Sequence, residues 1–151
     1  MIYKINPITG EVTKFNNVDA IGAGSSEWLD ATQEQINYQE SLQNKASQIA
    51  QAKLHRDTEQ YANIEYKNTF FKANSDTQAK MTARALGIEL EAKSGVDLAL
   101  IEVTWYDIND EAVTWTAIEF MGLFKAVLQR ANRLYAECNA IVQAIKNPAQ
   151  V

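Results

Sequence analysis

The sequence predicts an α+β fold: a long N-terminal helix, then two β-hairpin-plus-helix units whose helices pack on a small antiparallel sheet. Three observations predict it: a long stretch from about residue 31 to 61 without proline or glycine, and two later hairpin patterns, each followed by a helix-capping signal. With 151 residues, 46% of them hydrophobic, the chain can form one compact core. We expect three regions: a hairpin and linker at 1–26, a Gln-rich helix at 27–62 and a compact α+β domain at 63–151.

The first region contains a short hairpin. Its arms are Ile2–Ile5 and Glu11–Phe15, around an Asn6–Gly10 loop with proline near its start and glycine at its end. Because so small a hairpin is marginally stable alone, it must pair with another segment of this chain or of another one. The glycine-rich residues 22–26 are interpreted as a hinge or linker.

The long helix is predicted to begin near Ala31, with Asp30 as its N-cap and Gln33 three residues on. This helix has few large apolar residues, chiefly Ile36, Leu42, Ile49, Leu54 and Tyr61, and glutamine recurs between them. Leu42 and Ile49 are a heptad apart, but the phase then shifts and the intervening positions are poor core residues. Such a narrow stripe indicates an extended arm, packing in an oligomer, or one face laid along the domain.

The remaining chain repeats a hairpin followed by a capped helix. The first repeat places arms around 67–69 and a helix from about Thr77 to Lys93, after caps at 74–76. The second places arms at 101–106 and 112–115 around an Asp- and Asn-rich turn. Thr116 and Glu119 then form a capping box, and the apolar stripe that follows, as far as about Lys146, predicts the buried centre of the fold.

Composition and spacing argue against several kinds of site. The net charge of −5, with no basic run, argues against a nucleic-acid partner. The first residues lack the apolar core of a signal peptide and no apolar stretch is long enough for a membrane span, so we expect cytoplasmic synthesis and no membrane partner. The only histidine, His55, is interpreted as a solvated helix residue, and the only cysteine, Cys138, as a core residue.

The carboxylates of the turn at 107–111 lack calcium-loop spacing, and no phosphate-binding or nucleophile motif is present. We therefore expect no enzyme activity and no catalytic, cofactor-binding or metal-binding residues. Trp105 and Trp115, on opposite arms of the last hairpin, are better explained as packing residues than as an aromatic surface for carbohydrate or peptide.

From about Gln51 to Ile145 the chain resembles a bacteriophage-encoded domain family of unknown function, found in tail, tail-fibre and tail-fibre-assembly proteins. The resemblance rests on a basic helix end at 53–57, a short hairpin ending in Phe71, an Ala-rich helix capped near Asp76, and a Trp-containing hairpin leading into the helix that Thr116 opens. Thr9-Gly10 and the stretch 28–35 are similar to the N-terminal part of these proteins. The order of these elements is more specific than any one of them, and it implies a phage tail context.

The resemblance leads us to expect a tail-fibre assembly factor, a chaperone that binds the fibre protein during folding and trimerisation in the host cytoplasm. The alternative is a structural component of the virion tail that self-associates through the Gln-rich helix. The expected partners are a tail-fibre or other tail protein, or further copies of the chain. The candidate partner-binding residues are the apolar residues of the first half: Ile2, Tyr3, Ile5, Phe15, Trp28, Ile36, Leu42 and Ile49.

Overall fold

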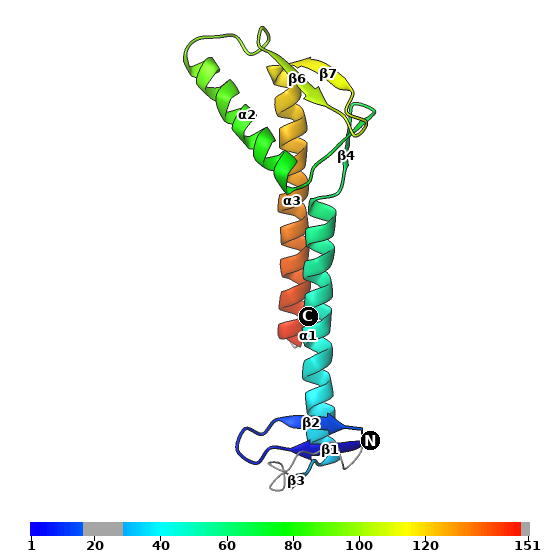
Figure 1. Ribbon diagram of the computed structural model, residues 1–151. Helices are drawn as coiled ribbons and strands as arrows, with labels where there is room; N and C mark the ends of the chain where they lie inside the picture. Colours follow the sequence, from blue (N-terminus) through cyan, green and yellow to red (C-terminus); the bar gives the residue numbers. More distant parts are fainter. Residues whose placement is uncertain (17–28, 149–151) are drawn as a thin grey trace. The chain divides into compact units, whose positions relative to one another are not determined.

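The computed structural model describes residues 1–16 and 29–148, and these residues form an α+β fold (Figure 1). The strands and helices are, in chain order, β1 (Ile2–Ile5), β2 (Val12–Phe15), β3 (Leu29–Asp30), α1 (Gln33–Gln60), β4 (Ile64–Tyr66), β5 (Thr69–Phe71), α2 (Ser75–Lys93), β6 (Glu102–Tyr106), β7 (Ala112–Thr116) and α3 (Ala117–Lys146). The chain divides into two compact units, Met1–Ala50 and Gln51–Val151, and the boundary falls within α1. The α+β prediction is thus confirmed, although three strands precede the long helix, which is therefore not N-terminal.

The N-terminal unit contains a three-stranded antiparallel sheet in the order β2-β1-β3. Ile2 pairs with Phe15 and Ile5 with Val12, which confirms the predicted hairpin. The further segment with which this hairpin was expected to pair is β3 of the same chain, because Lys4 and Ile5 of β1 pair with β3. The predicted linker at 22–26 lies outside the described residues.

The start of α1 differs from the prediction that Asp30 caps the helix. Asp30 instead lies in β3, where its carboxylate is 2.7 Å from Lys4 Nζ. Thr32 caps α1: its hydroxyl accepts from the Gln35 backbone N–H, and its own N–H donates to Gln35 Oε1. This reciprocal pair is a capping box that lies two residues later in the sequence than the expected one at Asp30 and Gln33.

Two hairpins of the second unit form separate two-stranded sheets, β4-β5 and β6-β7, and not the single small sheet expected. Lys67 and Asn68 connect β4 to β5 with positive φ angles of 51° and 61°, the backbone of a two-residue hairpin turn. In the β6-β7 turn the Asp107 carboxylate accepts from the N–H groups of Asn109 and Glu111. The acidic residues of this sequence therefore build a turn, as predicted.

The two predicted caps of the later helices are present. The Asn74 side chain accepts from the Thr77 N–H at the start of α2, and Thr116 and Glu119 form the capping box of α3. Asn147 and Pro148 follow the last residue of α3, as the sequence predicts.

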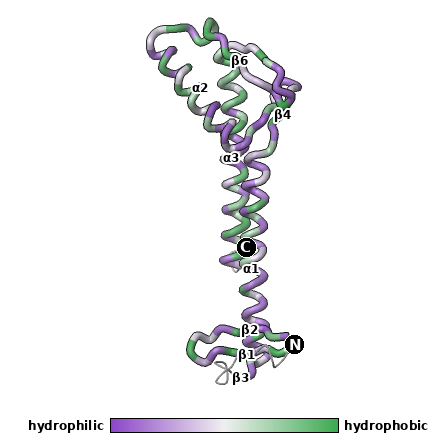
Figure 2. The backbone as a smooth tube through the Cα atoms, viewed as in Figure 1, coloured by the Kyte–Doolittle hydropathy of each residue, from purple (hydrophilic) through white to green (hydrophobic). Residues whose placement is uncertain are grey.

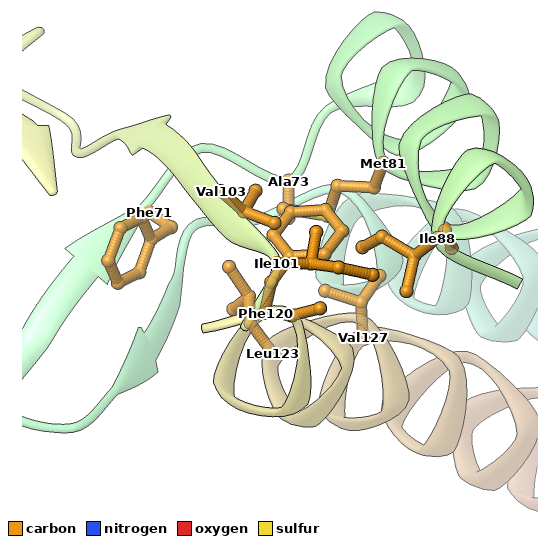
Figure 3. Close-up of a cluster of buried hydrophobic side chains, with 11 residues drawn as sticks. Phe71, Ala73, Met81, Ile88, Ile101, Val103, Phe120, Leu123 and Val127 are labelled. Atoms are coloured by element: carbon orange, nitrogen blue, oxygen red, sulfur yellow. The ribbon is translucent and has the colours of Figure 1, made fainter. Parts of the chain in front are cut away.

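The hydrophobic core lies entirely in the second unit, between α2, α3 and the two hairpins (Figure 3). Phe120, Leu123 and Val127 of α3 meet Met81 and Ile88 of α2 there, and all five side chains are buried. The prediction that α3 is the centre of the fold is correct for this first half of the helix. Further along, Leu134 and Cys138 are also buried, whereas Ile141 is 47% exposed.

A hydrogen-bond network holds the C-terminal end of α1 in the second unit. The Arg130 guanidinium of α3 donates to the carbonyls of Gln60, Ala62 and Asn63, at 3.0, 2.7 and 3.1 Å. Gln78 of α2 also donates to the Gln60 carbonyl. The last carbonyls of a helix lack partners within the helix, so these donors satisfy groups that would otherwise be unpaired.

Candidate functional site

The candidate partner-binding residues of the N-terminal strands are half-buried. Ile2, Tyr3 and Ile5 lie on β1, and Phe15 lies on β2 directly opposite Ile2. Trp28 lies outside the described residues. The four described side chains thus retain exposed surface, although β1 is paired on both of its edges.

Of the candidates on α1, the structure brings one close to the sheet. Ile36 is half-buried and lines a cavity of about 80 Å³ together with Tyr3 and Val12. The Tyr3 hydroxyl donates to Glu40 Oε1 at 3.1 Å, which ties β1 to the same part of the helix. Leu42 is 41% exposed and Ile49 is half-buried, and neither lines this cavity.

Among its described residues, the N-terminal unit has very little core. Val12 is the only described hydrophobic residue of this unit that is buried, and α1 buries no residue along its length. Ile8, Leu29 and Tyr38 are each more than 60% exposed. Figure 2 shows how strongly hydrophilic residues dominate α1. A helix of this kind gains most of its stability from packing, and the described residues of this unit supply little of it.

A second candidate site, which the sequence did not indicate, is a cavity of about 580 Å³ in the second unit. It lies between the first turns of α2 and strand β6, and is lined by Lys72, Asn74, Asp76, Thr77, Lys80, Thr104, Trp105, Tyr106, Asp107 and Asp110. Its volume is within the roughly 300–1,000 Å³ typical of binding pockets. Sequence reasoning missed it because α2 and β6 are separated by a long loop, and only the tertiary structure places them together.

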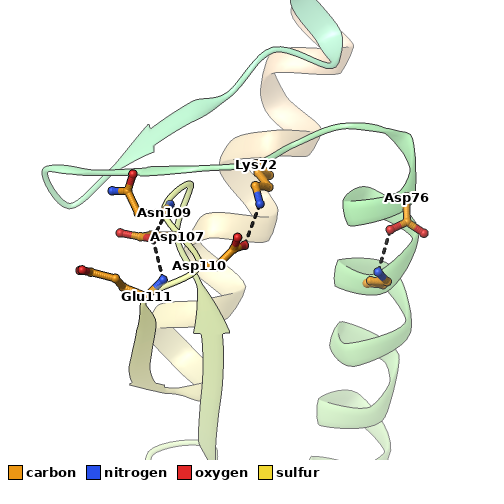
Figure 4. Close-up of polar contacts among 7 residues, drawn as sticks. Lys72, Asp76, Asp107, Asn109, Asp110 and Glu111 are labelled. Carbon is orange, nitrogen blue, oxygen red and sulfur yellow. Dashed lines mark hydrogen bonds and ion pairs between the residues drawn. The ribbon is translucent and has the colours of Figure 1, made fainter.

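Each of the two lysines that line this cavity forms an ion pair with an aspartate of the lining (Figure 4). Lys72 Nζ is 2.7 Å from Asp110 Oδ1, and Lys80 Nζ is 2.7 Å from Asp76 Oδ2. The Asp107 carboxylate is occupied by the two N–H groups of its own turn. Both lysines of the lining are therefore paired, whereas the negative charge of Asp107 is held by backbone N–H groups and not by a cation.

The two tryptophans of the last hairpin are packing residues. Val103 is paired with Trp115 and Trp105 with Val113, so the four side chains share one face of the hairpin. The Trp105 ring centroid is 5.1 Å from that of Phe120, and Trp115 contacts the rings of Tyr66 and Phe71 at 5.6 and 5.1 Å. This arrangement favours the packing interpretation over a paired aromatic surface for carbohydrate.

The structure confirms the interpretation of His55 as a solvated helix residue and of Cys138 as a core residue. His55 is exposed on α1, and Cys138 is buried beside Arg56 on the inner face of α3. The described residues contain no group of three or more His, Cys, Asp or Glu side chains that could hold a metal ion. In the same part of the chain, none of the helices combines the length and the hydropathy of a membrane-spanning segment.

Comparison with known proteins identifies the family. No match was found among curated proteins or among solved structures. A family model described as a domain of unknown function (DUF4376) matches residues 43–151, which include the second half of α1 and the whole second unit. Since this match covers well over half of the sequence, the chain belongs to the DUF4376 family.

Proposed function

We propose that the protein is a non-enzymatic bacteriophage tail-fibre assembly factor, which binds the fibre protein while its chains fold and trimerise. Its place of action is then the host cytoplasm during assembly. The phage context comes from the resemblance of residues 51–145 to domains of tail and tail-fibre-assembly proteins. The physical support comes from the N-terminal unit.

The observation that carries the proposal is how few of the described residues of that unit are buried. Val12 alone is buried among its described hydrophobic residues, while Ile2, Tyr3, Ile5 and Phe15 are half-buried on a small sheet. Small sheets need further packing for stability. A partner protein that covers Ile2, Tyr3 and Ile5 would add apolar contact to this sheet.

The chemistry of a fibre protein makes such a partner useful. Fibre chains are rich in β-structure that pairs late in folding, and their unpaired strand edges promote aggregation until the trimer closes. A small protein that binds an immature fibre chain would keep these edges from pairing wrongly. This role requires contact surfaces and no catalytic residues.

Co-expression tests the proposal directly. A tail-fibre protein is produced with and without this chain, and the soluble trimer is quantified by size-exclusion chromatography. We expect the trimer yield to rise several-fold with the full chain. A triple substitution of Ile2, Tyr3 and Phe15 by serine should reduce the gain, whereas Ile8→Ser, at an 88% exposed loop position, is the matched control.

The second candidate function is a structural component of the mature tail that self-associates through α1. It is favoured by Leu42 and Ile49, which are a heptad apart on a helix with no buried residue. Mass spectrometry of purified virions separates the two functions. Stoichiometric presence in the virion supports the structural role, and absence supports the assembly factor.

A further inference from the structure

When β6 pairs with β7, the main-chain N–H and C=O groups of every second β6 residue point away from β7, toward the outer edge of the hairpin. Outside the strands, the Asp107 N–H donates to the Glu111 carbonyl and the Ala117 N–H donates to the Ile101 carbonyl. In an antiparallel pair, hydrogen-bonded positions alternate with positions whose N–H and C=O point outward. With the register that pairs Val103 with Trp115, the main-chain groups of the even-numbered β6 residues, Glu102, Thr104 and Tyr106, point to the outer edge.

Both ends of this outer edge are already occupied. At one end, Arg84 of α2 donates to the Glu102 carbonyl at 3.4 Å. Beyond the other end, the Ile108 N–H donates to the Phe70 carbonyl of β5 at 3.0 Å. Between them, the main-chain N–H and C=O of Thr104 and Tyr106 have no hydrogen-bond partner within the described residues.

These open groups line the 580 Å³ cavity next to α2. Thr104 is exposed and Tyr106 is 57% exposed. Thr77 and Lys80 of α2 line the same cavity. The Lys72–Asp110 ion pair lies beside the β6-β7 turn (Figure 4). An open strand edge that faces a helix across a cavity is the arrangement into which an extended peptide inserts as an additional strand.

We propose that this groove, formed by the outer edge of β6 and the first turns of α2, binds an extended segment of a partner protein as a third strand beside β6-β7. The inference rests on the proposed function and deepens it, because it names how an immature β-rich fibre chain is held. The occupant is identified by hydrogen bonding: Thr104 and Tyr106 offer two donors and two acceptors in the spacing of an extended backbone. Since both lining lysines are already paired with carboxylates and the Asp107 carboxylate is bound within its own turn, main-chain contacts dominate recognition and many β-prone sequences are accepted.

The test removes one backbone N–H group that points to the outer edge of β6 and keeps the hydrogen bonds between β6 and β7. Thr104→Pro deletes an N–H that points into the groove, and proline is tolerated at such edge positions. Thr114→Pro is the matched control, because Thr114 is the cross-strand partner of Thr104 and its N–H points to the opposite edge. The two hydroxyls are 3.4 Å apart, so both variants lose the same side-chain contact. A second pair of variants is used if either threonine variant is not folded at the assay temperature. It consists of Tyr106→Pro and its control Ala112→Pro, which are again cross-strand partners.

The probe is a displayed library of random short peptides, selected for binding to the full-length protein. We expect enriched peptides that lose at least about tenfold in affinity for Thr104→Pro and keep their affinity for Thr114→Pro, since a main-chain hydrogen bond and the strand geometry are lost together. In amide hydrogen exchange, the Thr104 and Tyr106 N–H groups should slow when peptide binds, and those of Thr114 and Ala112 should not. Failure to enrich peptides, or equal binding to both variants, overturns the proposal.

Further outcomes separate this groove from the proposed function and from other occupants. If the full chain raises the fibre trimer yield and Thr104→Pro raises it equally, the groove inference fails while the assembly function stands. If peptides bind through β6 but the fibre yield is unchanged, the assembly function fails and the groove stands. If light scattering shows an oligomer of the free chain that Thr104→Pro dissociates, the occupant is a second copy, and the proposal of a partner protein is wrong.

Discussion

Gly122 lies where α3 passes closest to the β4 strand. A Cβ atom at this position would lie 2.1 Å from the Tyr66 hydroxyl oxygen and 3.1 Å from its ring carbon Cζ. The Tyr66 ring also packs edge-on against Trp115, which restricts its freedom to move away. The absence of a side chain at Gly122 therefore lets the β4-β5 hairpin approach α3.

We predict opposite effects of the same substitution at two helical glycines. Gly122→Ala should lower the free energy of unfolding by about 1–3 kcal/mol, because it forces Tyr66 out of its position. Gly87→Ala, whose nearest atom is Arg84 Nη1 at 3.7 Å, should be neutral or stabilise α2 by up to about 1 kcal/mol. Urea unfolding followed by circular dichroism measures both. Adding Tyr66→Phe to Gly122→Ala should recover part of the loss, and no recovery would show that the hydroxyl is not the obstacle.

At the scale of elements, Glu119 joins the start of α3 to the β4-β5 turn. Its carboxylate accepts from the Thr116 N–H in the capping box and is paired with Lys67 of the turn. The hydrogen bond from Lys67, followed by that from the Thr116 backbone, lowers the pKa of Glu119 below its ordinary value of 4.5. One side chain thus ties a helix terminus to a hairpin.

The lowered pKa of Glu119 predicts a dependence of stability on pH. The folded state holds its carboxylate more readily in the charged form than the unfolded chain does, so this stabilisation is fully present above pH 4.5 and is lost as the pH falls through the lowered folded pKa. We expect Glu119→Gln to flatten the decline of the melting temperature over this acid range. Glu137→Gln, which removes an exposed α3 carboxylate outside the capping box, is the control. If the two variants follow the same pH profile, the coupling to Lys67 does not contribute.

Elements whose signals are local in the sequence could be predicted. The three hairpins, the capping box of α3 and the end of that helix at Asn147 follow from turn and cap residues within a few positions of one another. The cap of α1 was assigned to Asp30 and not to Thr32, because the competing pairing of β3 with β1 is non-local. For the same reason a single sheet was expected, although each later hairpin pairs only with itself.

The candidate site was harder to predict than the fold. Tyr3 and Ile36 do line one cavity, but the open edge of β6 depends on which residues pair with β7 and on where α2 packs. Alternation along residues 102–106 signals a strand, yet it cannot show which edge stays open. The ion pair between Lys72 and Asp110 could not be predicted either, because these two residues are far apart in the sequence.

At the scale of the whole molecule, stability is concentrated in the second unit. The buried core cluster runs from Phe71 to Val127, and the described N-terminal unit adds only Val12. The family match likewise begins at residue 43, after the strands of the N-terminal unit. The second unit therefore contains nearly all of the described hydrophobic core, whereas we expect the N-terminal unit to contact a partner protein.

We predict that residues 43–151 fold without the N-terminal strands. Urea unfolding of this fragment should be cooperative, with a slope close to that of the full chain, because the slope scales with the surface exposed on unfolding. Residues 1–50 alone should show no cooperative transition. A fragment 43–151 that lacks a folded baseline would contradict the assignment of the core to the second unit.

We propose that this chain promotes assembly of a tail fibre by binding the fibre protein, and the yield of soluble trimer measures that effect. The fibre is co-expressed with the full chain, with residues 43–151, or with an empty vector, at matched fibre synthesis. We predict a several-fold higher trimer yield with the full chain, and a smaller gain with residues 43–151, which lack the N-terminal strands. Equal yields in all three cultures would contradict the account.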